Sequence, residues 1–375
     1  MVRTRLSLQE VVNKYDTGED PTILENLIRA FRKIQALPSS KPDSFFTIAG
    51  YHGEPFVSQD PDNPDWWGGY CQHETVLFPM WHRAYLLRIE EALRNVMAGV
   101  DLFLPYWDEC LAVGSDDNPV PWILTAPTFD LDGDTSNPLH SYTLQASIAN
   151  SPTEQARYAK HEGYVTVRYP RSGLVGTPGD IEKTAIHNAA FEDPDTNAAY
   201  LNANVKAWLD GTVQILPDKD TPNVPDTYSV DARYKISLDA PNYTVFSNKA
   251  SMAQWVKEQS GSGHGYALED GHNAIHLAVG GFYEKNKYNA DPIRGANGDM
   301  GDNETAGFDP IFYFHHAFVD YVFWTWQKKH DATAKGSIAI DPTYDGTTSQ
   351  GNPGVSQGHQ TRHEQPAYAI QEAQW

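Results

Sequence analysis

Several segments of the chain alternate apolar and polar residues with the period of an amphipathic helix. The first follows Asp20 and Pro21, a pair suited to the N-cap and the first turn of a helix. Behind this pair, apolar residues recur at spacings of three and four, at Ile23, Leu24, Leu27, Ile28, Phe31 and Ile34. The pattern predicts a helix that packs one face against a core.

Two further predicted helices place histidine among their apolar positions. One covers about residues 81–97, and its apolar face consists of His82, Leu86, Ile89 and Leu93. The other opens with Asp309 as cap and Pro310, and continues as IFYFHHAFVDYVFWTWQKKH. Shorter helices are expected near residues 251–258 and 272–279. An imidazole buried on such a face costs free energy unless it finds a partner, so each of these histidines needs an explanation.

The segments between the helices are rich in Pro, Gly, Asp and Asn and predict irregular loops. The longest are residues 60–69, 113–137 and 217–242, and short strands are expected near residues 163–169. The polar, turn-rich residues 331–375 indicate a wrapping tail. The expected fold class is therefore mainly α, a single domain over residues 1–375 with a central helix bundle, long irregular loops and a few short strands.

Composition and charge narrow the possible partners. The 375 residues are 40% hydrophobic and 21% charged, as in a globular protein. A formal net charge of −21 argues against nucleic acid or an anionic membrane as a partner. No apolar run approaches the roughly 20 residues of a membrane span. The start, MVRTRLSLQE, lacks the apolar core of a signal peptide, so the chain is intracellular or a mature secreted form, and the sequon at Asn242 gives weak support to secretion.

Six of the fourteen histidines fall into two groups of three. The first group is His52, His73 and His82, and the second is His272, His276 and His316. An H-x-x-x-H pair sets two imidazoles one turn apart on one helix face, suited to clasping one metal. Six imidazoles without an anionic ligand favour copper that cycles between Cu(I) and Cu(II).

Two other metal chemistries fit the residues less well. A zinc protease motif needs Glu after the first histidine, where this chain has Asn273. A di-iron carboxylate centre needs two Glu-x-x-His pairs, and Glu269 with His272 has no counterpart in the first group. Zinc hydrolysis is therefore a distant alternative.

Three stretches resemble the two copper-binding regions of the type 3 copper family, which comprises tyrosinases, catechol oxidases and hemocyanins. They are GYCQHETVLFPMWHRAYLLRIEEAL, LEDGHNAIHLAVGGFY and MGDNETAGFDPIFYFHHAFVD. The likeness covers about residues 45–110 and 265–330 and is nearest to short fungal-type tyrosinases. It implies a four-helix bundle that holds two copper ions, one (CuA) on His52, His73 and His82 and the other (CuB) on His272, His276 and His316. In the adjacent pair, the resemblance makes His316 the ligand and His315 a neighbour.

The resemblance also assigns roles around the metals. It implies a thioether between Cys71 and the ring of His73, and a water held by Glu269 and Asn273 that accepts the proton of a monophenol. Leu277, Asn303 and Ala306 correspond to positions that line the substrate entrance, and a polar Asn303 favours substrates with polar or charged tails.

Two carboxylates have structural roles by the same resemblance. Asp309 caps the last helix, and Asp320 orders backbone near the site. Tyr321 stands where relatives often have an arginine, so a familiar salt bridge is expected to be absent.

The implied activity is the O2-dependent oxidation of o-diphenols to o-quinones, together with o-hydroxylation of monophenols. Its partners are O2 and small phenols. The alternatives are a hemocyanin-like O2 carrier and a strict catechol oxidase. Carriers cover their coppers with an additional domain, whereas only residues 331–375 follow the last helix here. We therefore expect an open site without a C-terminal lid domain.

Overall fold

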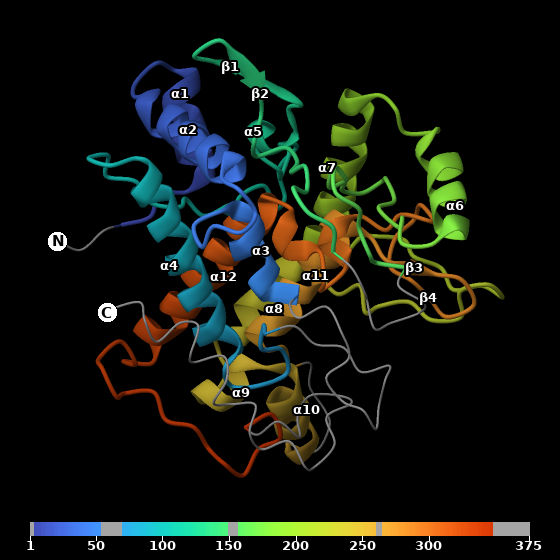
Figure 1. Ribbon diagram of the computed structural model, residues 1–375. Coiled ribbons are helices and arrows are strands. Elements are labelled where there is room, and N and C mark those ends of the chain that lie inside the picture. Colours follow the sequence, from blue (N-terminus) through green and yellow to red (C-terminus); the bar gives the residue numbers. More distant parts are fainter. Residues whose placement is uncertain (1–3, 54–69, 149–156, 260–264, 348–375) are drawn as a thin grey trace.

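The computed structural model describes residues 4–53, 70–148, 157–259 and 265–347, and helices make up most of its regular structure (Figure 1). The helices are α1 (Leu8–Asp16), α2 (Thr22–Ala36), α3 (Phe45–Gly53), α4 (Phe78–Val96), α5 (Trp122–Thr125), α6 (Pro178–Asn188), α7 (Pro194–Asp210), α8 (Val230–Ser237), α9 (Tyr243–Ser247), α10 (Lys249–Glu258), α11 (Leu268–Gly280) and α12 (Ile311–Lys329), with short 3-10 helices η2 (Asp299–Gly301) and η3 (Ala306–Phe308). Two antiparallel hairpins, β1 (Thr128–Leu131) with β2 (Asp134–Ser136) and β3 (Tyr283–Glu284) with β4 (Tyr288–Asn289), complete the described elements.

Helices α3, α4, α11 and α12 form the centre of the molecule. Helix α12 packs on both α4 and α11, and α3 packs on α4 and η3. Figure 1 shows α1 and α2 on one side of this bundle and α9 and α10 at its opposite end. Aromatic side chains fill the centre, for example Phe314 of α12 against Phe31 of α2 at 5.9 Å between ring centroids. The prediction of a mainly helical fold around a four-helix bundle is confirmed.

The predicted helices form, with small shifts at their ends. Helix α2 buries the predicted apolar face on α4, and the Asp20 carboxylate accepts a hydrogen bond from the Thr22 amide at 3.2 Å. Helix α4 begins at Phe78, three residues before the predicted start. The reason is Pro79, which fits the first turn of a helix because amides there have no intrahelical acceptor.

Three expectations about the loops were wrong. Residues 163–169 form no regular strand among the described elements, and Val165 makes only an isolated bridge to Thr143. The hairpin β1–β2 instead lies inside residues 113–137, which the sequence predicted as loop. Helix α8 lies inside the predicted loop 217–242, and α1, α6 and α7 were not predicted at all. The predicted loop 60–69 lies outside the described residues.

The first part of the predicted tail runs across α9 and α10. Asp341 donates its amide to Thr244 of α9 at 2.9 Å, and the carbonyl of Gly346 accepts the amide of Val76 at 2.9 Å. Residues 348–375, which include most of the predicted tail, lie outside the described part of the chain. None of the described helices is long and apolar enough to cross a membrane.

Candidate metal centre

The structure brings all six predicted histidine ligands together from four helices and one loop. His52 lies in the last turn of α3, His82 lies in the second turn of α4, and His73 lies in the loop before α4. In this first group the ring centroids are 5.3 to 5.7 Å apart. The second group combines His272 and His276 of α11 with His316 of α12. The two groups adjoin, because the rings of His82 and His316 stack at 4.4 Å.

The second group has the spacing of donors around one metal ion. The Nε2 atom of His316 lies 3.2 Å from Nε2 of His272 and 3.3 Å from Nε2 of His276. Three donors at about 2.0–2.1 Å from one metal in a plane lie about 3.5 Å from one another. A single proton on His316 can satisfy only one of its two contacts, whereas a metal ion satisfies all three nitrogens. The residues therefore fit a metal.

Hydrogen bonds at Nδ1 fix the tautomer of four of these rings. His52 donates to the Asn303 carbonyl at 2.8 Å, His82 to the Phe78 carbonyl at 2.8 Å and His276 to the Met300 carbonyl at 2.7 Å. His272 donates to the side-chain oxygen of Asn273 at 2.8 Å. With the proton on Nδ1, each Nε2 presents a lone pair, as a metal ligand must.

Burial keeps the six imidazoles neutral. Burial, helped by a neighbouring histidine in each case, lowers the pKa of His52 and of His276 to about 3. The pKa values of His73, His82, His272 and His316 are also far below the usual value, mainly because of burial. The Nε2 atoms of His52 and His82 are buried without a hydrogen-bond partner in the described structure. Such orphaned nitrogens are costly unless a metal takes their lone pairs.

Cys71 lies beside the ring of His73. Its Sγ is 3.4 Å from Nδ1 of His73, and the side-chain Nδ2 of Asn303 donates to the same sulfur at 3.5 Å. The sulfur is therefore close enough to the ring for the predicted thioether, which stays a prediction.

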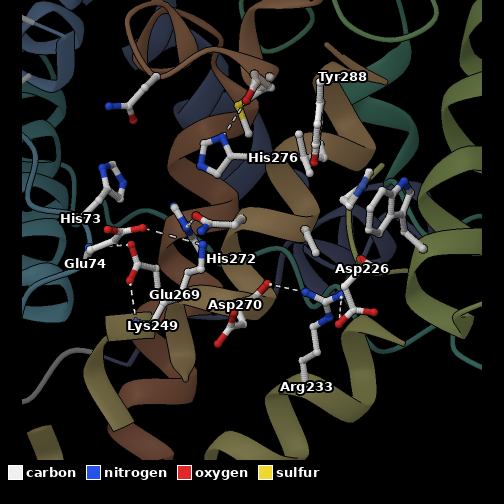
Figure 2. Close-up of a pocket in the computed structure, with 18 residues that line it drawn as sticks. His73, Glu74, Asp226, Arg233, Lys249, Glu269, Asp270, His272, His276 and Tyr288 are labelled. Atoms are coloured by element: carbon white, nitrogen blue, oxygen red, sulfur yellow. Dashed lines mark hydrogen bonds and ion pairs between the residues drawn. The ribbon is translucent and has the colours of Figure 1, made fainter. Parts of the chain in front are cut away.

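Glu269 connects the loop of His73 to α11. Its carboxylate is 1% exposed and accepts the amide of Glu74 at 2.8 Å and the amide of Lys249 at 3.0 Å (Figure 2). Burial raises its pKa to about 7, although the two amides oppose the shift. The carboxylate thus has an anchoring role that the sequence did not indicate, and its predicted role in holding a water stays a prediction.

A cavity of about 630 Å³ opens beside the second group. His73, His272 and His276 line its metal side, and Figure 2 shows Asp226, Arg233 and Tyr288 at the other end. Of the residues predicted to line the substrate entrance, Leu277 and Asn303 do so. Ala306, the third residue predicted to line the entrance, is fully buried in η3 and is not among the described residues that line this cavity.

Two predicted carboxylates hold α12 in place. Asp309 accepts the amide of Ile311 at 3.0 Å, as a cap does, and also pairs with the buried Arg168 at 2.6 Å. The prediction that Asp320 orders backbone was wrong. Its described partners are the side chains of Arg5 at 2.7 Å and Arg83 at 2.5 Å. These arginines come from other parts of the chain, so Asp320 is paired although Tyr321 is not an arginine.

Sequence reasoning missed the partners of His315. Its Nδ1 is 2.5 Å from a carboxylate oxygen of Glu109, and the Tyr234 hydroxyl donates to the other oxygen at 3.0 Å. Glu109 precedes His315 by 206 residues, so no local spacing indicates the pair.

Comparisons with known proteins agree with this arrangement. Tyrosinase HcTyr2 from Hahella sp. is 43% identical in a 370-residue alignment that covers 95% of this chain and 66% of that protein. A tyrosinase from Aspergillus oryzae is 43% identical in a 361-residue alignment that covers 89% of this chain and 63% of that protein. The solved tyrosinase from Burkholderia thailandensis at low pH is 45% identical with a TM-score of 0.78, over 95% of this chain and 67% of that one.

The chain therefore spans about two thirds of the length of these relatives. The family described as the common central domain of tyrosinase matches residues 42–329, which include all six histidines of the two groups. The chain belongs to the tyrosinase family, a family of dicopper enzymes.

Proposed function

We propose that this protein uses O2 to oxidise o-diphenols to o-quinones and to hydroxylate monophenols at the ortho position. The main support for this proposal is the pair of adjoining histidine groups. Their rings are buried and neutral, and Nδ1 hydrogen bonds leave Nε2 available to bind a metal. His52, His73 and His82 would hold one copper ion, and His272, His276 and His316 the other. When bound, the pair supplies O2 binding and two-electron redox chemistry.

In this proposal the substrate binds in the cavity beside the second histidine group. Leu277 and Asn273 are partly exposed on α11 and lie between the second histidine group and the surface. A phenol that enters there meets the apolar side chain of Leu277 on its way to the metal ligands. Access of this kind supports turnover rather than O2 storage.

Proton transfer from a monophenol falls to Glu269 in this proposal. A group whose pKa is near the working pH is the best general base, and in the copper-free structure burial raises the pKa of Glu269 to about 7. Both of its oxygens accept one backbone amide, which leaves lone pairs for a water in the adjoining cavity. Asn273, fixed through its contact with His272, borders the same space.

The test combines metal analysis with O2 uptake. Copper-loaded protein should contain two coppers per chain and consume O2 with 4-tert-butylcatechol and, more slowly, with 4-tert-butylphenol. His82→Asn and His316→Asn should each lose copper and O2 uptake, whereas His161→Asn, at an exposed loop position, should retain both. Reversible O2 binding without catechol oxidation would identify a carrier. Oxidation of the catechol alone would identify a strict catechol oxidase.

A further inference from the structure

A seventh imidazole, that of His315, lies directly behind the second histidine group. It is fully buried on α12, and its ring stacks on His272 at 5.2 Å and meets His276 edge-on at 5.0 Å. Donor atoms of His272, His276, His315 and His316 all lie within 4.8 Å of one another. The structure thus offers four imidazoles where the resemblance assigns three.

When it is ionised, the buried carboxylate of Glu109 accepts the Nδ1 proton of His315 and holds the ring in the tautomer of a metal ligand. Nδ1 of His315 is 2.5 Å from Glu109, whose second oxygen is occupied by the hydroxyl of Tyr234. All three side chains are buried. A carboxylate that accepts the Nδ1 proton of a histidine is the arrangement found behind metal-binding histidines, because it orients the ring and strengthens Nε2 as a donor.

The Nε2 atom of His315 has no hydrogen-bond partner in the described part of the chain, although it is buried. The other three rings of the group each have a described contact for Nε2, namely each other. A buried lone pair without a partner costs free energy. A metal ion bound by the second group would accept the lone pair of His315 Nε2 and remove that cost.

We propose that His315 is a fourth nitrogen ligand of the second copper ion while that ion is bound alone, and that Glu109 is its positioning residue. The proposal rests on the proposed function, because it takes copper as the metal. Nitrogen donors suit Cu(II), and His315 would add a fourth imidazole to the three of this group. Donors at about 2.0–2.1 Å from one metal lie at most about 4.2 Å apart, and the donor atoms of the four rings already lie within 4.8 Å of one another.

This fourth ligand would help the second site to retain Cu(II) before the first site is filled. The first group has no fourth imidazole among the described residues, since the further potential donor that lies beside His52 and His73 is the sulfur of Cys71. The second site would therefore be the first to load.

The experiment isolates the second site. His52→Ala/His82→Ala protein receives one equivalent of Cu(II), and its electron paramagnetic resonance spectrum is recorded, since a lone Cu(II) is paramagnetic. We expect hyperfine structure from four nitrogens. The added change His315→Gln, which keeps a donor toward Glu109, should reduce this to three and weaken Cu(II) binding about 10- to 100-fold in competition with nitrilotriacetate. His272→Ala/His276→Ala in the same background should remove the four-nitrogen hyperfine structure, although unbound Cu(II) keeps a signal of its own.

The role of Glu109 has its own variant. Glu109→Gln in the same background should shift the copper spectrum and weaken Cu(II) at least about tenfold, whereas Glu162→Gln, in an exposed loop, should leave both unchanged. A three-nitrogen spectrum in the parent protein overturns the proposal even if His315→Gln does not fold. Failure of the proposed function would appear elsewhere, as wild-type protein with two coppers that takes up no O2 with a catechol.

Discussion

Replacing Glu269 with glutamine should change how the stability of the copper-free protein depends on pH. The carboxyl group is 1% exposed, and burial raises its pKa to about 7, whereas the same group in the unfolded chain has its ordinary value of 4.5. Between these two pH values the folded protein holds a proton that the unfolded chain has released. Stability therefore falls as the pH rises through this window.

The size of the effect follows from the shift. One pKa unit corresponds to about 1.36 kcal/mol, so a shift from 4.5 to about 7 corresponds to about 3 kcal/mol. This stabilisation is complete below pH 4.5 and is lost above pH 7. The glutamine of the Glu269→Gln variant does not titrate, so the wild-type protein should lose about 3 kcal/mol relative to that variant between about pH 4.5 and pH 8.

Urea unfolding of both proteins across this range, with copper removed by chelation, measures the difference. Other buried groups, including His52 with a pKa of about 3 and Asp291 with a pKa of about 8, titrate in both proteins and cancel in the comparison. Glu162→Gln, at an exposed carboxylate, is the matched control and should run parallel to wild type. If the Glu269→Gln curve is also parallel to wild type, burial does not raise the pKa of Glu269 and the reasoning fails.

Three further substitutions test other contacts. Asn273→Ala removes the acceptor of the His272 Nδ1 proton. It should lower the initial rate with a monophenol at least about tenfold more than the rate with a diphenol. Equal losses of the two rates would show that Asn273 has a purely structural role. Arg168→Leu leaves the carboxylate of Asp309 buried without its ion pair and should cost about 3–5 kcal/mol in urea unfolding, and a loss under about 1 kcal/mol would contradict this. Gly280→Ala places a methyl group against the backbone of Gly301 and should lower the melting temperature by several degrees, which an unchanged melting curve would disprove. Peptide mass analysis should find Cys71 joined to His73, two hydrogens lighter than the free pair, and a Cys71 that alkylates freely in copper-loaded protein would refute the thioether.

The histidine groups could be predicted because their signal is local. The spacing of His272 and His276 defines one helix face, and His82 and His316 stand among apolar helical residues. The acceptors that orient these rings could not be predicted in the same way. They are mostly backbone carbonyls, such as that of Met300, and a carbonyl carries no sequence signal about which side chain will reach it.

The missed elements had weaker or overlooked signals. Helix α7 opens with Asp193 and Pro194, the same start signal as Asp20 and Pro21, but its Asn- and Ala-rich sequence dilutes the apolar stripe. The β1–β2 hairpin turns at Asp132 and Gly133, which both have positive φ, at 58° and 81°. An Asp-Gly pair is a strong hairpin signal, and it was available in the sequence.

The contacts around the histidines run between the two copper-binding regions. His52 of the first region is oriented by the carbonyl of Asn303 in the second, and Glu269 of the second region anchors the amide of Glu74, next to His73 in the first. Each group therefore depends on the other region for the orientation of a ring or of the loop that carries it. Because these contacts span about two hundred residues or more, they exist only when the bundle has assembled. Metal binding is then linked to folding of the whole bundle rather than to either region alone, and copper should stabilise that bundle through both groups together.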